Sequence, residues 1–303
     1  MKIYILILII LGLTITVNAQ QLPQISQRTT DVMVYNPAYV GATENPEIIL
    51  HHRSQWVGFT GAPTTQLLSY NGKVKGNMGL GGYIVNDITG PSRRITFNAN
   101  YAYHLEFDNF KLSLGIAATV MQYGLDGNNI TIKDQTDVSV QQGVSDRAWK
   151  PDASFGVYLY SEKYFVGLSV MQLIGSKVKL YNSNFEGEIP LANHFYIISG
   201  YHIDFEDELI FTPSFLFNTT IGSPSQIDFN CKLDYLNKVF GGITFRYNDA
   251  VVLMGGIKIK EQFSIAYSYD IVTSNLRKYN SGSHEIILSF TILPAENYGN
   301  SLL

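Results

Sequence analysis

The chain has a single cysteine and few charged residues. Cys231 is the only cysteine among 303 residues, which excludes an internal disulfide and a metal site built from several cysteines. Asp, Glu, Lys and Arg together make up 15% of the chain, against about 25% in soluble proteins. The formal net charge is −4, so no excess of basic residues predicts binding to nucleic acid.

Long apolar runs are absent after the first twenty or so residues. Lys2 precedes an apolar stretch from Ile3 to Val17, and Val17 and Ala19 supply the small residues of a signal-peptidase site. We therefore predict a secretory signal peptide over residues 1–19. No later stretch has the roughly 18 uninterrupted apolar residues of a transmembrane helix, and no cysteine follows the cleavage site to carry a lipid. The sequence predicts an exported protein that is not held in the inner membrane.

Alternation of apolar and polar residues fills most of the remaining chain, together with 20 Tyr and 17 Phe residues. Ile227, Phe229 and Leu233 alternate with polar neighbours at the period of two that places side chains on opposite faces of a strand. Such stretches are about ten residues long, enough for a tilted strand to cross a bilayer. The strands that this pattern predicts lie near 47–56, 64–73, 77–87, 93–107, 110–124, 151–161, 163–173, 191–206, 208–219, 225–235, 238–247, 250–259, 261–271 and 281–293.

The connections between these strands alternate in length. One set is short, as at Val74–Gly76. The other set is mostly longer: 88–92 is one of its shorter connections, and 125–150 and 174–190 are its longest. Only the short connection Asn248-Asp249 breaks the pattern. Outer-membrane barrels have short periplasmic turns and longer external loops. A soluble β-sandwich explains the strand alternation but not the loop lengths. We predict an all-β fold, a transmembrane antiparallel outer-membrane barrel of about 14 strands.

The predicted barrel spans residues 47–293, and two other segments flank it. Residues 20–46 contain Pro23, Pro37 and Pro46 and show no clean alternation. We expect this N-terminal segment to lie at the periplasmic mouth or to form a plug, with a short helix over Ile25–Tyr35. Residues 294–303 are predicted to be a C-terminal tail.

Several charged residues fall on the inner face of the predicted strands. Their neighbours on either side are apolar, so the period of two turns them away from lipid. Two interpretations remain open: a selective or ligand-lined pore, and a polar interior whose charges pair with one another. Cys231 falls on the outer face. The inward-facing charged residues are Glu106, Asp228, Lys232, Asp234, Arg246, Lys258, Asp270 and Glu285.

No catalytic or metal-binding pattern emerges. His284-Glu285 lacks a partnering serine motif, and nucleophilic catalysis needs a nucleophile, a base and an orienting group in reach. Residues 126–129, with Asp134 and Asp137, offer oxygen ligands but not the spacing of a calcium loop, so an ordinary polar loop is the simpler interpretation. We expect no enzyme activity, no catalytic residue, no cofactor and no metal.

Short motifs along the chain resemble those of the PorP/SprF family of type IX secretion membrane proteins. They lie in the family's order between about residues 23 and 293, each short but together fairly specific. The candidate partner-binding or structural residues carried over from these motifs are Tyr35, Asn36, Pro37, Gly41, Arg53, Gln55, Trp56, Asp270, Gly282, His284 and Glu285. The motifs are YNPAYVG (35–41), RSQW (53–56), GAPT (61–64), KPDASFG (150–156), VGLS (166–169), YSYD (267–270) and GSHE (282–285).

The resemblance implies a location in the outer membrane of a Gram-negative bacterium and a role in secretion and gliding motility. It implies two protein partners, the C-terminal domain of a secreted adhesin and components of the type IX system, in addition to outer-membrane lipid. Trp149, Tyr181 and Phe185 in the two longest connections suit contacts with another protein, although these loops equally suit a lid over the barrel mouth. The alternative function is a passive or selective diffusion channel.

Overall fold

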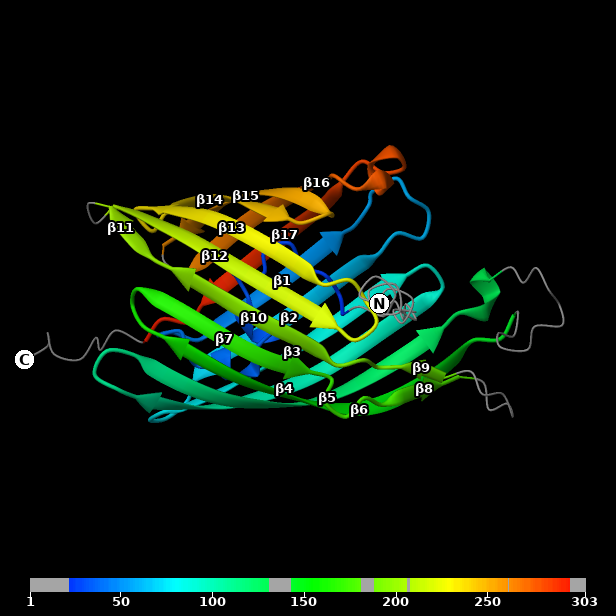
Figure 1. Ribbon diagram of the computed structural model, residues 1–303, viewed down its shortest axis with the longest axis horizontal. Helices are drawn as coiled ribbons and strands as arrows, with labels where there is room; N and C mark the ends of the chain where they lie inside the picture. Colours follow the sequence, from blue (N-terminus) through cyan, green and yellow to red (C-terminus); the bar gives the residue numbers. More distant parts are fainter. Residues whose placement is uncertain (1–21, 131–142, 181–187, 206–207, 261, 295–303) are drawn as a thin grey trace, which may run out of the picture.

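The computed structural model describes residues 22–130, 143–180, 188–205, 208–260 and 262–294, which include a closed antiparallel barrel (Figure 1). The predicted signal peptide lies outside these residues. Fourteen strands pair in one ring, closed where β1 pairs with β17 and β10 pairs with β12. The barrel strands are β1 (Glu47–Ser54), β2 (Thr64–Lys73), β3 (Met78–Thr89), β4 (Ser92–Glu106), β5 (Lys111–Leu125), β6 (Asp146–Tyr160), β7 (Tyr164–Met171), β10 (His194–Tyr201), β12 (Leu209–Thr220), β13 (Gln226–Tyr235), β14 (Val239–Arg246), β15 (Ala250–Ile259), β16 (Phe263–Val272) and β17 (Ser283–Thr291).

Three short strands supplement the ring. β11 (Ile203–Phe205) follows β10 and pairs with the start of β12. β8 (Lys177–Lys179) and β9 (Glu188–Pro190) pair with each other in a separate two-stranded sheet. The predicted all-β barrel of about 14 strands is therefore confirmed, and β2 begins and ends where the alternation placed it.

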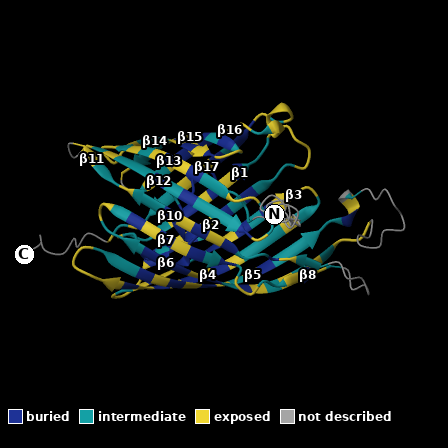
Figure 2. Cartoon of the chain, in the orientation of Figure 1, coloured by how far each residue is buried: buried dark blue, intermediate teal, exposed yellow. Residues whose placement is uncertain are grey.

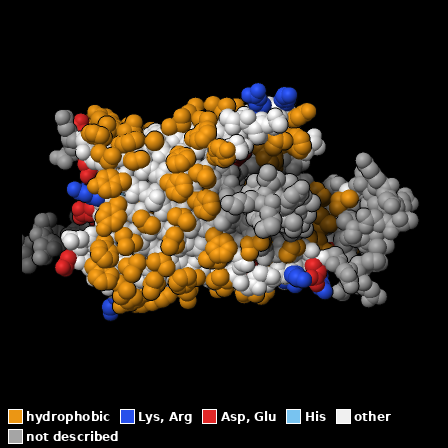
Figure 3. Space-filling view, viewed as in Figure 1, with side chains coloured by type: hydrophobic (Ala, Val, Ile, Leu, Met, Phe, Trp, Pro, Cys, Tyr) orange, Lys and Arg blue, Asp and Glu red, His pale blue; other side chains and the backbone are white. Residues whose placement is uncertain are grey.

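The two faces of the barrel wall differ in chemistry. Along β13, Asp228 is buried and its neighbour Phe229 is 54% exposed. The same alternation of buried and exposed residues recurs around the ring (Figure 2), and apolar side chains gather over the outside of the strands (Figure 3). Cys231 is exposed on the outer face, as predicted. An apolar exterior and a polar interior are what a barrel in a membrane requires.

The two ends of the barrel differ in their connections. We call the end with Val74–Asn77 and Leu236–Lys238 the short-turn end, and the end with residues 126–145 and 172–193 the long-loop end. The connection predicted at 88–92 is shorter than expected, because β3 and β4 extend until only Gly90-Pro91 separates them. β4, β5 and β6 have 15 residues each, whereas β7 and β10 have eight.

Trp149 lies in a strand and not in a loop. β6 begins at Asp146, so its ladder with β5 includes Trp149 opposite Gln122. The prediction that 125–150 is one connection is therefore wrong at its C-terminal end. Pro151 is tolerated in β6 because the edge of β6 that faces β7 is not yet paired at this residue. Tyr181 and Phe185 lie outside the described residues.

Residues 22–46 contain no α-helix. The helix predicted over Ile25–Tyr35 does not form: this range contains one 3₁₀ turn, η1 (Val32–Val34), and a second turn, η2 (Pro37–Tyr39), follows it. The Asn36 side chain accepts a hydrogen bond from the backbone N–H of Ala38 (3.0 Å) and so caps η2. Such bonds from a side chain to the nearby backbone compete with helix formation, and other polar groups of the segment, such as the Ser26 N–H, bond to the barrel wall. Two further 3₁₀ turns, η3 (Gly127–Asn129) and η4 (Asn275–Lys278), lie in the long-loop connections.

Candidate functional site in the barrel lumen

Residues 22–46, which we call the luminal segment, lie among the inward-facing side chains of the barrel. At the long-loop end, the Gln24 side chain donates to Asp249 (3.1 Å), and its oxygen accepts from Gln55 (3.1 Å). At the short-turn end, the carbonyl of Pro46 accepts from the N–H of Ile292 (2.8 Å). The luminal segment therefore runs from the long-loop end to the short-turn end before β1 begins at Glu47 and returns.

Two residues of the YNPAYVG motif (35–41), Gly41 and Asn36, also form hydrogen bonds to the barrel wall. The N–H of Gly41 donates to Asn71 Oδ1 (2.7 Å), and Gly41 has φ of +78°, a backbone conformation that favours glycine. The Asn36 side chain donates to the carbonyl of Val157 (3.0 Å). These bonds fix the segment to strands on two sides of the lumen.

Inward-facing glycines make room for this segment. A Cβ added to Gly115 would overlap the backbone of Ala38, and a Cβ added to Gly156 would overlap the Asn36 side chain. The backbone of Val40 occupies the space beside Gly79 in the same way. Glycine in a strand often marks a close approach of another backbone, so these positions match the wall to residues 36–40.

An apolar core joins the luminal segment to the wall. Met33, Ala38 and Val40 are fully buried, and they belong to one cluster with wall residues such as Leu67 and Tyr158. Tyr35 packs against Tyr196 with ring centroids 5.3 Å apart. The segment is therefore held against the inner face of the wall by both packing and hydrogen bonds.

A buried ionic cluster lies above this core, toward the long-loop end. Arg53 of β1 forms an ion pair with Asp270 of β16 (2.8 Å between Nη2 and Oδ2) and lies 3.7 Å from Glu285 of β17. The Ser26 hydroxyl donates to Asp270 (2.6 Å), accepts from Arg53, and the Ser26 N–H donates to Glu285 (2.7 Å). His51 lies between Glu285 (3.8 Å) and Asp31 (3.5 Å). Charges from three strands thus meet on the luminal segment.

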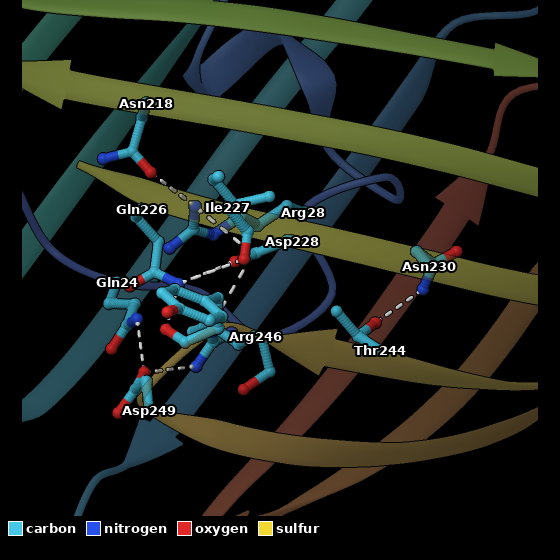
Figure 4. Close-up of polar contacts among 12 residues, drawn as sticks. Gln24, Arg28, Asn218, Gln226, Ile227, Asp228, Asn230, Thr244, Arg246 and Asp249 are labelled. Carbon is cyan, nitrogen blue, oxygen red and sulfur yellow. Dashed lines mark hydrogen bonds and ion pairs between the residues drawn. The ribbon is translucent and has the colours of Figure 1, made fainter. Parts of the chain in front are cut away.

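The cluster continues to β13 and β14. Figure 4 shows Asp228 between Arg28, which comes from the luminal segment, and Arg246 of β14. The Asp228 carboxylate lies 3.4 Å from the Arg28 guanidinium and 3.5 Å from that of Arg246, which also pairs with Asp249 and Asp270 (3.2 Å each). Arg246 is fully buried. Breaking a buried pair leaves an uncompensated charge at a cost of about 3–5 kcal/mol, so this cluster fixes the segment in one position.

The remaining inward charges lie nearer the short-turn end. Lys232 pairs with Asp234 (3.1 Å), and the Lys258 ammonium donates to Asn237 (2.5 Å). Glu106 is only half-buried at the rim, where it pairs with Lys111 (3.4 Å). Of the two interpretations of the inner charges, the structure favours a mutually paired interior.

A cavity of about 480 Å³ opens beside the luminal segment at the short-turn end. Thr29, Phe165, His202, Lys232 and Lys258 are among its lining residues. Its mixture of apolar, neutral and oppositely charged side chains gives it no net preference for one charge. The described residues contain no cluster of three or more His, Cys, Asp or Glu placed to hold a metal ion.

The β8–β9 hairpin lies at the long-loop end, beside β6. Val178 and Leu191 pack on Met121, which faces inward from β5. The Glu188 carboxylate accepts from Lys177 (2.6 Å) and Lys179 (2.8 Å), and these hydrogen bonds hold the pKa of Glu188 at about 2, below its usual value. The described part of this connection therefore packs on the wall formed by β5 and β6.

The structure brings some of the motif residues together and separates others. Arg53, Asp270 and Glu285 meet in the ionic cluster, and Gln55 contacts the luminal segment at Gln24. Asn36, Pro37 and Gly41, with the buried Tyr35, belong to the segment itself.

His284 lies apart from this cluster, on the outer face. Its Nδ1 bonds to the Tyr267 hydroxyl (2.6 Å). Gly282 has φ of +87° beside Tyr269, and the Trp56 N–H donates to Ser283 Oγ (3.0 Å). These residues shape the connection between β16 and β17 and its contact with the end of β1.

Sequence reasoning missed five members of the ionic cluster, one of which, Asp249, lies in the short connection between β14 and β15. Ser26, Arg28 and Asp31 lie in a segment without alternation, so no pattern assigned their side chains to a face. His51 was recoverable, since it lies two residues from Arg53 and therefore on the same face of β1.

The comparisons with known proteins agree with this geometry. The sequence model of the family described as type IX secretion system membrane protein PorP/SprF matches residues 17–290. No curated protein matches the chain by sequence. Among the described residues, no helix combines the length and the hydrophobicity of a membrane span.

Solved structures with a similar fold include three channels or transporters. The toluene transporter TbuX of Ralstonia pickettii is 12% identical, with a TM-score of 0.54 over 86% of this chain and 92% of that chain. The CymD monoaromatic hydrocarbon channel is 13% identical (TM-score 0.49, 86% and 91%), and the toluene transporter TodX of Pseudomonas putida is 10% identical (TM-score 0.48, 86% and 93%). At such identities the likeness to TbuX shows the fold alone.

Proposed function

The chain belongs to the family of type IX secretion system membrane proteins PorP/SprF, and from that premise we propose that it is a non-enzymatic outer-membrane barrel that binds a secreted surface protein. The bound protein is an adhesin, and the barrel helps to deliver it or to retain it at the outer membrane. Family membership supports a secretion partner. The occupied lumen supports binding over free diffusion.

One observation carries the preference for binding over conduction. The luminal segment fits between inward-facing glycines, with Gly115 and Gly156 leaving space for residues 36–38, and the ionic cluster fixes it at Arg53 and Asp270. A diffusion channel needs a continuous water path through the barrel. We propose that residues 22–46 act as a resident plug that blocks this path.

The orientation of the barrel gives the two ends different partners. Short turns of outer-membrane barrels face the periplasm, and long loops face the cell surface. The cavity beside Thr29 and His202 therefore faces components of the type IX system in the periplasm. The long-loop end, with the β8–β9 hairpin, faces a partner that has already crossed the membrane.

We propose that the connections 126–145 and 172–193 hold the adhesin by its C-terminal domain. The test shortens each connection separately and measures how much of that domain is captured by the purified barrel. The control shortens 273–280, which lies at the same end but on the opposite flank of the β1 strand and leaves Gly282 in place. Loss of capture with 126–145 or 172–193 shortened, and not with the control, supports the proposal.

The same experiment identifies the alternatives. If both shortened variants capture the domain as well as the wild type, the binding surface lies elsewhere, and capture at the short-turn end would be tested next by substituting Lys232 and Lys258. If the intact protein captures nothing and passes a steady ion current, it is a channel. Heat-dependent migration on gels, typical of a closed barrel, shows that each variant is folded.

A further inference from the structure

Charged residues are almost absent from the outer face of the barrel wall. Every Asp, Glu and Lys in the fourteen barrel strands lies on the inner face, as at Asp228, Lys258 and Glu285. Arg53, Arg94 and Arg246 also face inward, where they form ion pairs. Two charged residues of these strands face outward, and both are arginines: Arg93 of β4 and Arg147 of β6.

These two arginines lie on one line across the wall. In the strand register, Arg93 is opposite Gly124 of β5, and Gly124 is opposite Arg147. Two strand spacings separate their backbones, about 9.6 Å. A Cβ at Gly124 would contact Cγ of Arg147 at 3.4 Å, so the Arg147 stem leans over the glycine toward β4. Because Gly124 has no side chain, none lies between Arg93 and Arg147 along this line.

Their depth is set by the apolar band below them. The outward residues of β4 from Leu105 to Ile95 are apolar, tyrosine or alanine, and Arg93 is the next outward position. Ten residues at about 3.4 Å each, tilted by about 40°, give a height of about 26 Å. That height matches the roughly 25 Å apolar band of outer-membrane barrels. Arg93 therefore lies where lipid head groups begin, on the side of the long loops.

An aromatic pair beside the two arginines is typical of the membrane interface. Trp149 follows Arg147 on the outer face and stacks on Phe97 with ring centroids 6.3 Å apart. Aromatic residues gather at such interfaces, where one edge meets lipid and the other meets water. The aromatic pair thus marks the boundary that the two arginines overlie.

The arginines are available to a ligand. The Nε of Arg93 donates to Asn86 Oδ1 (2.7 Å), which fixes the stem and leaves the other guanidinium nitrogens. Within the part of the chain that the structure describes, no ion pair involves Arg93 or Arg147. The nearby carboxylate of Asp126 accepts from Asn128 (3.0 Å) and Ser145 (2.9 Å).

We propose that Arg93 and Arg147 form a binding site for a phosphorylated glycolipid of the outer leaflet. Arginine binds phosphate through paired N–H donors, and basic positions beside membrane spans recognise anionic head groups. The separation of the two strands suits two phosphate groups on one head group. The lipid would fix this side of the barrel, the tall wall of β4 to β6, against the membrane.

Native mass spectrometry of the full-length protein tests the site, with diphosphoryl lipid A as the probe in a neutral detergent. The wild type is expected to retain lipid A, and R93Q/R147Q to bind it about 30-fold more weakly, since each surface cation contributes about fivefold. The control R277Q/K278Q removes two exposed cations of η4 at the same end and is expected to match the wild type.

Three further results decide the proposal. Weaker retention of monophosphoryl lipid A supports two-phosphate recognition, whereas equal retention of phosphatidylglycerol overturns the assignment to a glycolipid. Displacement of lipid A by an equal concentration of inorganic phosphate also overturns it. Should R93Q/R147Q fail to fold, the single variants R93Q and R147Q decide: each is expected to bind lipid A about fivefold more weakly, and retention equal to wild type in both contradicts the site.

Discussion

Adding a methyl group to two inward-facing glycines is expected to loosen the luminal segment while leaving the barrel closed. In G115A/G156A, one new Cβ meets the backbone of Ala38 and the other meets the Asn36 side chain. Overpacking of this kind costs about 1–3 kcal/mol per site. The strands are held by their own ladders, with Gly115 opposite Gly156, so the strain falls on the segment.

Hydrogen exchange measured by mass spectrometry reads this effect. Two sites together cost at least about 2 kcal/mol, which corresponds to about 30-fold faster exchange. The amides to follow are those of Ala38, whose N–H bonds to the Asn36 side chain that the new Cβ displaces, and of Gly41, whose N–H bonds to Asn71 on the wall.

The matched control places the same methyl group on the other face of the wall. In G241A/G255A, the nearest atoms lie 3.6 and 3.7 Å from the added Cβ, which is ordinary contact, so exchange in residues 38–41 should not change. Equal exchange in the two double variants would refute the fit between the glycines and the segment. So would loss of protection in the barrel strands before the segment.

Three other perturbations follow from the same structure. Asp270→Asn leaves Arg53 and Arg246 short of a buried carboxylate, and it should lower the free energy of unfolding by about 3–5 kcal/mol in urea titrations, whereas Glu106→Gln at the half-exposed rim should change it by less than about 1 kcal/mol. Phe229→Arg on the lipid face should cost about 2–4 kcal/mol in folding into bilayers, and Lys232→Arg on the inner face should be tolerated; equal costs, or the reverse order, would show that the residues are assigned to the wrong faces. The pKa of Glu188 is lowered to about 2 by Lys177 and Lys179, so its contribution to the hairpin should be complete above about pH 4.5 and lost as the pH falls toward 2; carboxyl titration by NMR near pH 4.5 would contradict this.

The barrel wall was predictable because its constraints are local. A strand that faces lipid on one side and a polar lumen on the other must alternate at every residue, so Ile227–Tyr235 reveals its two faces without any knowledge of its neighbours. The same rule placed Asp270 and Glu285 inside, where both are buried. The loop lengths added the direction of each strand.

The contents of the lumen depend on contacts that no local pattern records. Ser26 bonds to Asp270 across 244 positions of the chain, and Arg28 meets Asp228 in the same way. The luminal segment has no period of its own, because its residues face different strands in succession. The roles of the inward glycines were likewise visible only once Gly115 and Gly156 were seen against residues 36–38.

Outward arginines were hidden for a related reason. Arg93 and Arg147 each lie at the end of a strand, where a charged residue is unremarkable in sequence. Their significance comes from the register through Gly124, which places them on one line, and from the paired state of every other arginine in the wall. Register is a property of strand pairs and not of single strands.

Single-channel recording of the intact protein in planar bilayers tests the central claim most directly. With residues 22–46 resident between the glycines and the ionic cluster, we predict no steady ion current from the wild type. A variant lacking residues 22–46, confirmed as folded by heat-dependent migration, should conduct. A steady current from the intact protein, equal to that of the shortened variant, would contradict a closed lumen and make the protein a diffusion channel.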